Sequence, residues 1–428
     1  MTDDVLFVGH SLVGHTMPRM LDALLPASQL VRAQVINGSP LNYNWDHGAG
    51  AEGVNARAVL PSGAYGTLIL TEAIPLAGHL QWSNTYGIAR NYAGLAWAAN
   101  PSARVMIYET WHEIGSNAAA WRANLTSDLA LWQGIATHVN AVKPSSAPIT
   151  GIVPGGQAMG MMYDAAISGR GMGITQIQQL FTDQIHLNDA GNYLISLVQY
   201  AAITGRSPIG LTDKLTGEWG QPYTGWTTDQ TILFQHIAWE AAARAPGAIL
   251  VRGSVLPQLV IGTNSNETLQ GGNGHDRVYG NRGNDTINGG NGDDIVAGER
   301  GHDQVYGGDG NDLLLGGLNN DFLFGGNGSD RLHGEAGNDQ MTGGAGADDF
   351  VFARGGGIDR ILDFSVSQRD QLMLDDSLWT GTRTASQVIS SFATVTAEGV
   401  LFNFGTGGTL LLQGVTTTIG LAALIEIT

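Results

Sequence analysis

The sequence predicts an α/β domain with a parallel sheet, followed by an all-β domain built as a parallel β-roll. Within residues 1–206, short apolar runs alternate with segments of helical periodicity. This alternation is typical of a parallel sheet covered by helices on both faces. From Gly271 to Val351, a nine-residue unit recurs nine times without interruption. A fixed period of this kind indicates stacked repeats that share one core.

Five apolar runs are expected to form the parallel strands of the first domain. They lie within residues 4–9, 30–38, 65–73, 103–111 and 147–156. Helical spacing is found in residues 15–25, 86–99, 119–142 and 187–205. A further helical segment, 227–245, lies in a region that we interpret as an extension and connector. Ligands of parallel α/β sheets bind at the carboxyl ends of the strands, where Gly9, Gly38 and Glu72 fall.

Each repeat unit has glycine first, aspartate sixth and an apolar residue eighth. Glycine permits the positive φ values of a tight turn, and aspartates with backbone carbonyls supply the oxygen ligands that calcium prefers. Two units per coil would place units n and n+2 on the same side, which gives about seven calcium ions between stacked turns. The unit "GGLNND" departs from the pattern because Asn319 replaces its fourth glycine. The predicted calcium ligands are Asp276, Asp285, Asp294, Asp303, Asp312, Asp321, Asp330, Asp339 and Asp348. The side chains predicted to point inward are Val278, Ile287, Val296, Val305, Leu314, Leu323, Leu332, Met341 and Phe350.

Residues 262–351 resemble the RTX calcium-binding β-roll, whose signature is this nonapeptide. The resemblance implies several structural Ca²⁺ ions. The stretch "DRILDFSVSQRDQLMLDD" and the ending "LAALIEIT" look like the C-terminal flank of RTX proteins, which carries an uncleaved type I secretion signal. We therefore expect an extracellular protein whose partners include the type I secretion machinery. Clustered carboxylates repel one another without calcium, so the roll should fold only where calcium is available.

Composition and charge narrow the function classes. Residues 1–260 hold 16 acidic and 12 basic residues, whereas residues 261–428 hold 22 acidic and 8 basic residues. This acidity argues against a nucleic-acid partner and, in the second part, favours bound cations. The absence of cysteine excludes disulfides, thiolate metal sites and cysteine nucleophiles. We expect no transmembrane segment, because no apolar run reaches roughly 18 residues. We also expect no N-terminal signal peptide, because the N-terminus lacks the basic-then-apolar order of one.

Ser11 follows the first predicted strand in the stretch "VGHSL". It lacks the second glycine of a Gly-x-Ser-x-Gly nucleophile elbow. Far downstream, "FTDQIHLND" places Asp183 and His186 three residues apart in a loop before a helix. A carboxylate at this spacing can orient an imidazole, and an oriented imidazole can take the proton of a serine nucleophile.

Over residues 3 to about 204, these blocks resemble the SGNH, or GDSL-type, serine esterases. "VGHSL", Gly38 in "VINGSPLNYNW", and Asp183 with His186 match three of the family's blocks in order. The resemblance implies a three-layer, flavodoxin-like parallel sheet, a Ser11–His186–Asp183 triad and no catalytic cofactor. It also implies an oxyanion hole that includes the backbone amides of Ser11 and Gly38.

Two positions depart from the SGNH pattern. His10 stands where the family usually has aspartate, and no Gly-x-Asn-Asp block follows the third strand, where the sequence has Glu72. Asn84 is our candidate for the third oxyanion donor. The alternatives are a helix-capping or loop role for Asn84, with a hole of two backbone donors. Glu72 is not expected to donate to the oxyanion and is a candidate for organising the loop or binding substrate.

The expected function is that of a secreted, calcium-stabilised serine esterase acting on short acyl esters, such as acetyl groups on carbohydrate. One alternative is a lipase or thioesterase for longer acyl chains, and the other is a non-catalytic extracellular calcium-dependent adhesion or surface protein. Tyr43, Trp45, Trp82 and Trp111 lie in or beside the strand-end loops and are candidates for substrate contact. The expected organisation is a hydrolase domain (1–210), a helical extension (211–260), the β-roll (261–352) and a C-terminal β flank with the secretion signal (353–428).

Overall fold

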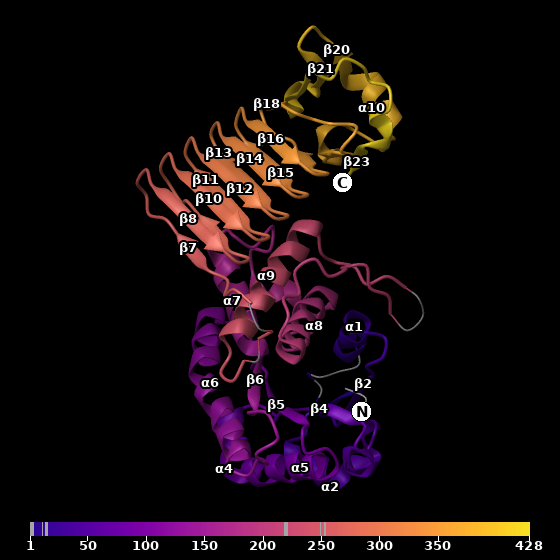
Figure 1. Ribbon diagram of the computed structural model, residues 1–428, viewed down its shortest axis with the longest axis vertical. Coiled ribbons are helices and arrows are strands. Elements are labelled where there is room, and N and C mark those ends of the chain that lie inside the picture. Colours follow the sequence, from indigo (N-terminus) through magenta and orange to yellow (C-terminus); the bar gives the residue numbers. More distant parts are fainter. Residues whose placement is uncertain (1–3, 11, 13–15, 218–220, 249, 252–253) are drawn as a thin grey trace. The chain divides into compact units, whose positions relative to one another are not determined.

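The computed structural model describes residues 4–10, 12, 16–217, 221–248, 250–251 and 254–428 (Figure 1). The chain divides into two compact units, Met1–Ser254 and Val255–Thr428. Ser11, the predicted nucleophile, lies outside the described residues. No helix in the described part of the chain is both long enough and apolar enough to cross a bilayer.

The first unit contains one sheet, with the strand order β3-β2-β1-β4-β5-β6 in its described residues. Five of these strands are parallel and agree with the five predicted runs, while the two-residue β3 joins β2 in an antiparallel pair at the edge. Without β3, the order along the sheet is the doubly wound, flavodoxin-like one, so the predicted fold class is confirmed. The strands are β1 (Asp4–Gly9), β2 (Val31–Val35), β3 (Glu52–Gly53), β4 (Tyr65–Leu70), β5 (Arg104–Glu109) and β6 (Gly151–Pro154).

Helices cover both faces of this sheet. Every residue of β1 is buried, as expected of a central parallel strand. Leu6 and Val8 pack into one core with residues of α2, α5 and α6, while α8 contacts α1, α7 and α9. Figure 1 shows α2 and α5 on one side of the strands and α1 and α8 on the other. The helices are α1 (Thr16–Leu24), α2 (Leu41–His47), α3 (Ala56–Val59), α4 (Leu76–Trp82), α5 (Thr85–Ala99), α6 (Ala118–Asn140), α7 (Gly155–Ile167), α8 (Asp189–Thr204) and α9 (Thr228–Arg244).

The predicted extension, residues 211–260, contributes α9 to the first unit. The helix begins at a capping box, in which Thr227 and Gln230 satisfy each other's backbone amides. Its residues from Leu233 to Ala243 are buried, and it packs against α7 and α8. The helix therefore extends the hydrophobic core of the α/β unit.

The second unit contains two long sheets, which the chain enters alternately from β7 to β20. One has the order β20-β21-β22-β18-β16-β14-β12-β10-β8, and the other β23-β19-β17-β15-β13-β11-β9-β7. Helix α10 (Ala385–Phe392) and strands β18 to β23 belong to the predicted C-terminal flank, and these strands continue both sheets. The strands are β7 (Leu259–Ile261), β8 (Thr268–Asn273), β9 (Arg277–Tyr279), β10 (Thr286–Asn291), β11 (Ile295–Arg300), β12 (Gln304–Asp309), β13 (Leu313–Leu318), β14 (Phe322–Asn327), β15 (Arg331–Ala336), β16 (Gln340–Ala345), β17 (Asp349–Phe352), β18 (Ile358–Ile361), β19 (Gln371–Leu374), β20 (Ala393–Val395), β21 (Gly399–Asn403), β22 (Thr409–Gln413) and β23 (Ile425–Ile427).

The register of the repeat strands shows two nonapeptides per coil. Val305 pairs with Ile287 on one side and with Leu323 on the other, so in-register residues are 18 apart in sequence. The eighth-position side chains of all nine units have no exposed surface and form one core. The predicted β-roll and its inward-facing residues are therefore confirmed.

Candidate active site and calcium-binding repeats

The end of β1 lies beside the loop that follows β2. The Ile36 amide donates to the Gly9 carbonyl at 3.1 Å, which extends the pairing of the two strands by one bond. Two residues later, Gly38 has a φ of +64°. A Cβ on Gly38 would meet no atom within 4 Å, so its left-handed backbone, and not lack of space, favours glycine here. The backbone thus places Gly38 next to the strand end that precedes Ser11.

Asp183 and His186 form the predicted pair. Asp183 Oδ2 lies 2.8 Å from His186 Nδ1, and Asp183 Oδ1 accepts the backbone amides of Ile185 and His186 at 2.8 and 2.7 Å. These amides, with the imidazole, lower the pKa of Asp183 to about 2, so the carboxylate is ionised at neutral pH. Both side chains are about half exposed, which leaves the pair accessible to a substrate.

Two bonds anchor this loop to the segment after β5. The Trp111 indole donates to the Ile185 carbonyl at 2.9 Å, and the Ile114 amide donates to the Gln184 carbonyl at 2.9 Å. Because residues 111 and 114 follow the carboxyl end of β5, the loop lies at the predicted ligand-binding edge of the sheet. Trp111 is fully buried, so it supports the loop and cannot stack on a substrate as the sequence suggested.

The remaining aromatic candidates differ in their exposure. Trp82, the last residue of α4, is 80% exposed, and Tyr43 is 44% exposed and stacked on His47. Trp45 is partly buried beneath the guanidinium of Arg57. Tyr43 and Trp82 therefore offer aromatic surface to solvent.

His10, which precedes Ser11, is buried at 3% exposure. Burial lowers its pKa to about 4, the Glu72 backbone carbonyl opposes this shift, and His79 and His186 lower the pKa further. His10 is therefore a neutral imidazole at pH 7.

Glu72 and Asn84 lie in the segments after β4. The Glu72 carboxylate is buried at 1% exposure and accepts three hydrogen bonds, which sequence reasoning did not predict. Asn84 precedes α5 with a φ of +49°, and a Cβ on Gly87 would come within 2.7 Å of its Oδ1. The Asn84 side chain thus lies against the first turn of its own helix, and its role as an oxyanion donor stays a prediction.

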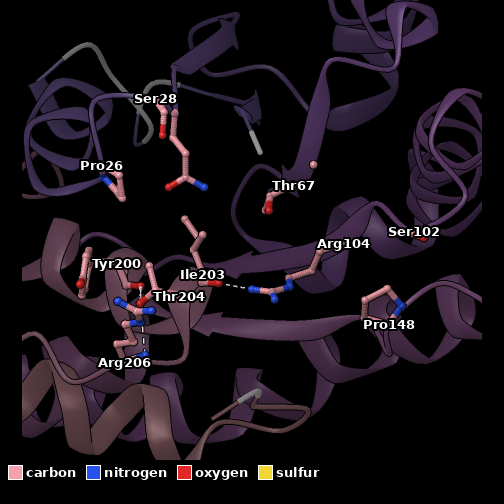
Figure 2. Close-up of a pocket in the computed structure, with 12 residues that line it drawn as sticks. Pro26, Ser28, Thr67, Ser102, Arg104, Pro148, Tyr200, Ile203, Thr204 and Arg206 are labelled. Carbon is pink, nitrogen blue, oxygen red and sulfur yellow. Dashed lines mark hydrogen bonds between the residues drawn. The ribbon is translucent and has the colours of Figure 1, made fainter. Parts of the chain in front are cut away.

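A cavity of about 630 Å³ in this unit lies at the other ends of the strands. Its lining includes Thr67 at the start of β4 and Arg104 at the start of β5 (Figure 2). The Arg104 guanidinium donates to the Ile203 carbonyl near the end of α8. The cavity is therefore separate from the edge that holds Asp183 and His186.

In the second unit, the sixth-position aspartates share one geometry. Each Oδ1 accepts a backbone amide from 18 residues earlier, as in the 2.7 Å bond from the Asp294 amide to Asp312. The Oδ2 atoms of all nine aspartates are buried and accept no hydrogen bond from the described residues. First-position glycines make room for these oxygens, since a Cβ on Gly307 would come within 2.3 Å of Asp312 Oδ2.

This donor set fits calcium, a hard cation that binds carboxylate and carbonyl oxygens. Burial raises the pKa of Asp312 to about 9 and that of Asp294 to about 8, with neighbouring carboxylates adding to both shifts. No group of three or more His, Asp or Glu side chains placed to hold a metal occurs among the described residues. Backbone carbonyls would therefore have to complete each coordination shell, as predicted.

Comparison with known families supports this interpretation of the repeats. The family described as the RTX calcium-binding nonapeptide repeat matches residues 261–296, 288–323, 315–350 and 324–361. The second unit carries RTX calcium-binding repeats. No curated protein matches the chain.

Several solved structures resemble the chain at low identity. A DUF4886 family protein from Bacteroides uniformis is 16% identical, with a TM-score of 0.41 over 58% of this chain and 97% of its own. A GDSL-like lipase from Parabacteroides merdae is 13% identical, with a TM-score of 0.33 over 48% and 96%. The extracellular lipase LipA from Serratia marcescens is 12% identical, with a TM-score of 0.21 over 81% and 71%.

Proposed function

We propose that the protein is a secreted serine esterase whose first unit hydrolyses carboxylic esters and whose RTX repeats bind structural calcium. The observation that carries the proposal is the Asp183–His186 pair. A carboxylate that accepts two backbone amides and the imidazole Nδ1 holds the ring in one orientation. The nitrogen that Asp183 does not engage, Nε2, is then the basic atom for the serine.

In the proposed mechanism, Ser11 attacks the ester carbonyl carbon while His186 Nε2 takes the hydroxyl proton. Asp183 stabilises the resulting imidazolium, and the proton passes to the leaving alcohol as the acyl-enzyme forms. Water then attacks the acyl-enzyme, again with His186 as the base, and releases the acid and Ser11. The amides of Ser11 and Gly38 would donate to the oxyanion, with Asn84 as the candidate third donor.

The substrate we favour is a short acyl ester, such as an acetyl group on a carbohydrate. The Asp183–His186 pair is about half exposed, and Trp82 and Tyr43 present aromatic faces to solvent in the same unit. Exposed aromatic faces suit sugar rings, whereas long acyl chains call for an enclosed apolar cavity. Bound calcium would stabilise the repeats once the protein reaches an extracellular medium, after export by a type I secretion system.

Hydrolysis of chromogenic acetate, butyrate and palmitate esters tests the proposal in calcium-containing buffer. We expect activity that decreases with acyl length and that Ser11→Ala abolishes. Ser28→Ala, in the loop between α1 and β2, is the matched serine control and should retain wild-type rates. Equal rates for wild type and Ser11→Ala would refute the serine esterase, and a palmitate preference would favour a lipase.

A further inference from the structure

Glu72 is a buried carboxylate whose bonds join three segments that are far apart in sequence. Its Oε1 accepts the Leu41 amide at 2.7 Å and the Ala73 amide at 2.8 Å. Its Oε2 accepts the Thr85 hydroxyl at 2.5 Å. The three donors belong to the start of α2, the loop after β4 and the first turn of α5.

These segments carry the predicted oxyanion donors. Leu41 follows Gly38 by three residues, and Thr85 follows Asn84 directly. The loop after β4 is fixed to β1 as well, since the Thr71 amide donates to the Val8 carbonyl at 3.1 Å. One carboxylate is therefore bonded to the segments of two expected oxyanion donors, Gly38 and Asn84, the remaining donor being the Ser11 amide.

The environment of Glu72 makes these bonds hard to replace. The carboxylate and the Thr85 side chain are both almost completely buried, so water cannot take the place of a lost partner. A buried carboxylate is costly unless hydrogen bonds compensate for the water it loses, and here three donors do so. Loss of one partner would leave a buried charged oxygen unsatisfied, and the attached segments would shift to relieve it.

We propose that Glu72 is a positioning residue of the ester-hydrolysing site, which holds the Gly38 loop and the start of α5 at a fixed spacing so that their donors reach the oxyanion. The inference rests on the proposed function.

The test uses two variants that weaken the same bond, between Glu72 Oε2 and the Thr85 hydroxyl, one from each partner. Glu72→Gln keeps Oε1 and replaces Oε2 by an amide nitrogen, and Thr85→Val removes the hydroxyl without changing side-chain shape. Displacing donors by about 1 Å can cost roughly 100-fold in rate. We expect each variant to lower kcat for an acetate ester at least about tenfold, with KM changed less than about twofold. Thr85→Ser, which restores a hydroxyl, should rescue kcat.

Glu109→Gln is the matched control. Glu109 is also a carboxylate at 1% exposure at a strand end, but it bonds the amide and side chain of Gln157 in α7. A structural effect common to buried carboxylates would lower kcat equally in Glu109→Gln and Glu72→Gln. A positioning role lowers kcat only in Glu72→Gln and Thr85→Val. In these two variants it also weakens inhibition by an alkylboronic acid, which forms a tetrahedral adduct on serine.

The outcomes separate this inference from the proposed function. Wild-type kcat in Glu72→Gln and Thr85→Val, with Ser11→Ala inactive, would overturn the role of Glu72 and leave the esterase standing. An equal loss of kcat in Glu109→Gln would overturn it too. Wild-type activity in Ser11→Ala would overturn both, because no Ser11 site would remain for Glu72 to position.

Discussion

Replacing His10 by glutamine should remove a large part of the acid sensitivity of the first unit. His10 has an unfolded-state pKa of about 6.5 and a folded-state pKa lowered to about 4 by burial. Between these values the unfolded state binds a proton that the folded state does not. The free energy of unfolding therefore rises with pH across this window and falls as the medium becomes acidic.

The magnitude follows from the two pKa values. One pKa unit corresponds to about 1.4 kcal/mol, so the shift is worth about 3 kcal/mol in total. Between pH 8 and pH 4.5, proton linkage at His10 should cost about 2.5 kcal/mol of the free energy of unfolding. The side chain is 3% exposed, so solvent screening reduces this figure little. Glutamine does not titrate, so His10→Gln should lack this component.

Urea unfolding followed by tryptophan fluorescence measures the effect, because nine of the ten tryptophans lie in residues 1–254. The difference between wild type and His10→Gln at pH 8 gives the packing cost of the substitution. That difference should then shift by about 2.5 kcal/mol in favour of His10→Gln at pH 4.5. A difference that stays constant to within about 0.5 kcal/mol from pH 8 to pH 4.5 would refute the buried neutral imidazole.

Three further predictions concern the triad and the repeats. Asp183→Asn should lower kcat about 10³- to 10⁴-fold, because an amide cannot hold the imidazole tautomer that the carboxylate selects; stopped-flow or steady-state rates within tenfold of wild type would contradict this role. Chelation of calcium should unfold residues 262–351 and remove their β-type circular dichroism, which calcium should restore; a spectrum indifferent to chelator would rule out the calcium-dependent roll. Gly307→Ala places a Cβ within 2.3 Å of Asp312 Oδ2 and should raise the calcium concentration needed for folding, whereas a calcium titration that overlays that of wild type would show that this oxygen is not a ligand.

The repeats could be predicted almost completely because the length of the nonapeptide fixes which residues lie side by side in successive coils. Two units per coil fix an 18-residue register, and that register places every sixth-position aspartate beside the one two units further along the chain. The central strands β1, β4 and β5 were predictable as well, since buried parallel strands are continuous apolar runs. Helix α7 was not, because it begins with Gly155 and Gly156, which disfavour helix. Close packing of α7 on β5 explains why glycine stands at the start of the helix, since a Cβ on Gly155 would come within 2.6 Å of the Tyr108 ring.

The candidate site was predictable only where its partners are close in sequence. Asp183 and His186 are three positions apart, so the pair could be inferred from spacing. Glu72 bonds partners 31 and 13 residues away, and only the folded chain brings them together. In the sequence, Glu72 is recognisable only as a carboxylate directly after an apolar strand. That position does not reveal whether the Glu72 side chain faces solvent or other loops.

Covalent labelling of Ser11 tests the central claim most directly. A fluorophosphonate reacts with serines that are activated as nucleophiles, so it reports on the triad whatever the natural substrate is. We predict one adduct on the calcium-loaded protein, located on Ser11 by peptide mass spectrometry, and no adduct in His186→Ala. No adduct on wild type, or one on a serine other than Ser11, would contradict the serine esterase proposed for the first unit.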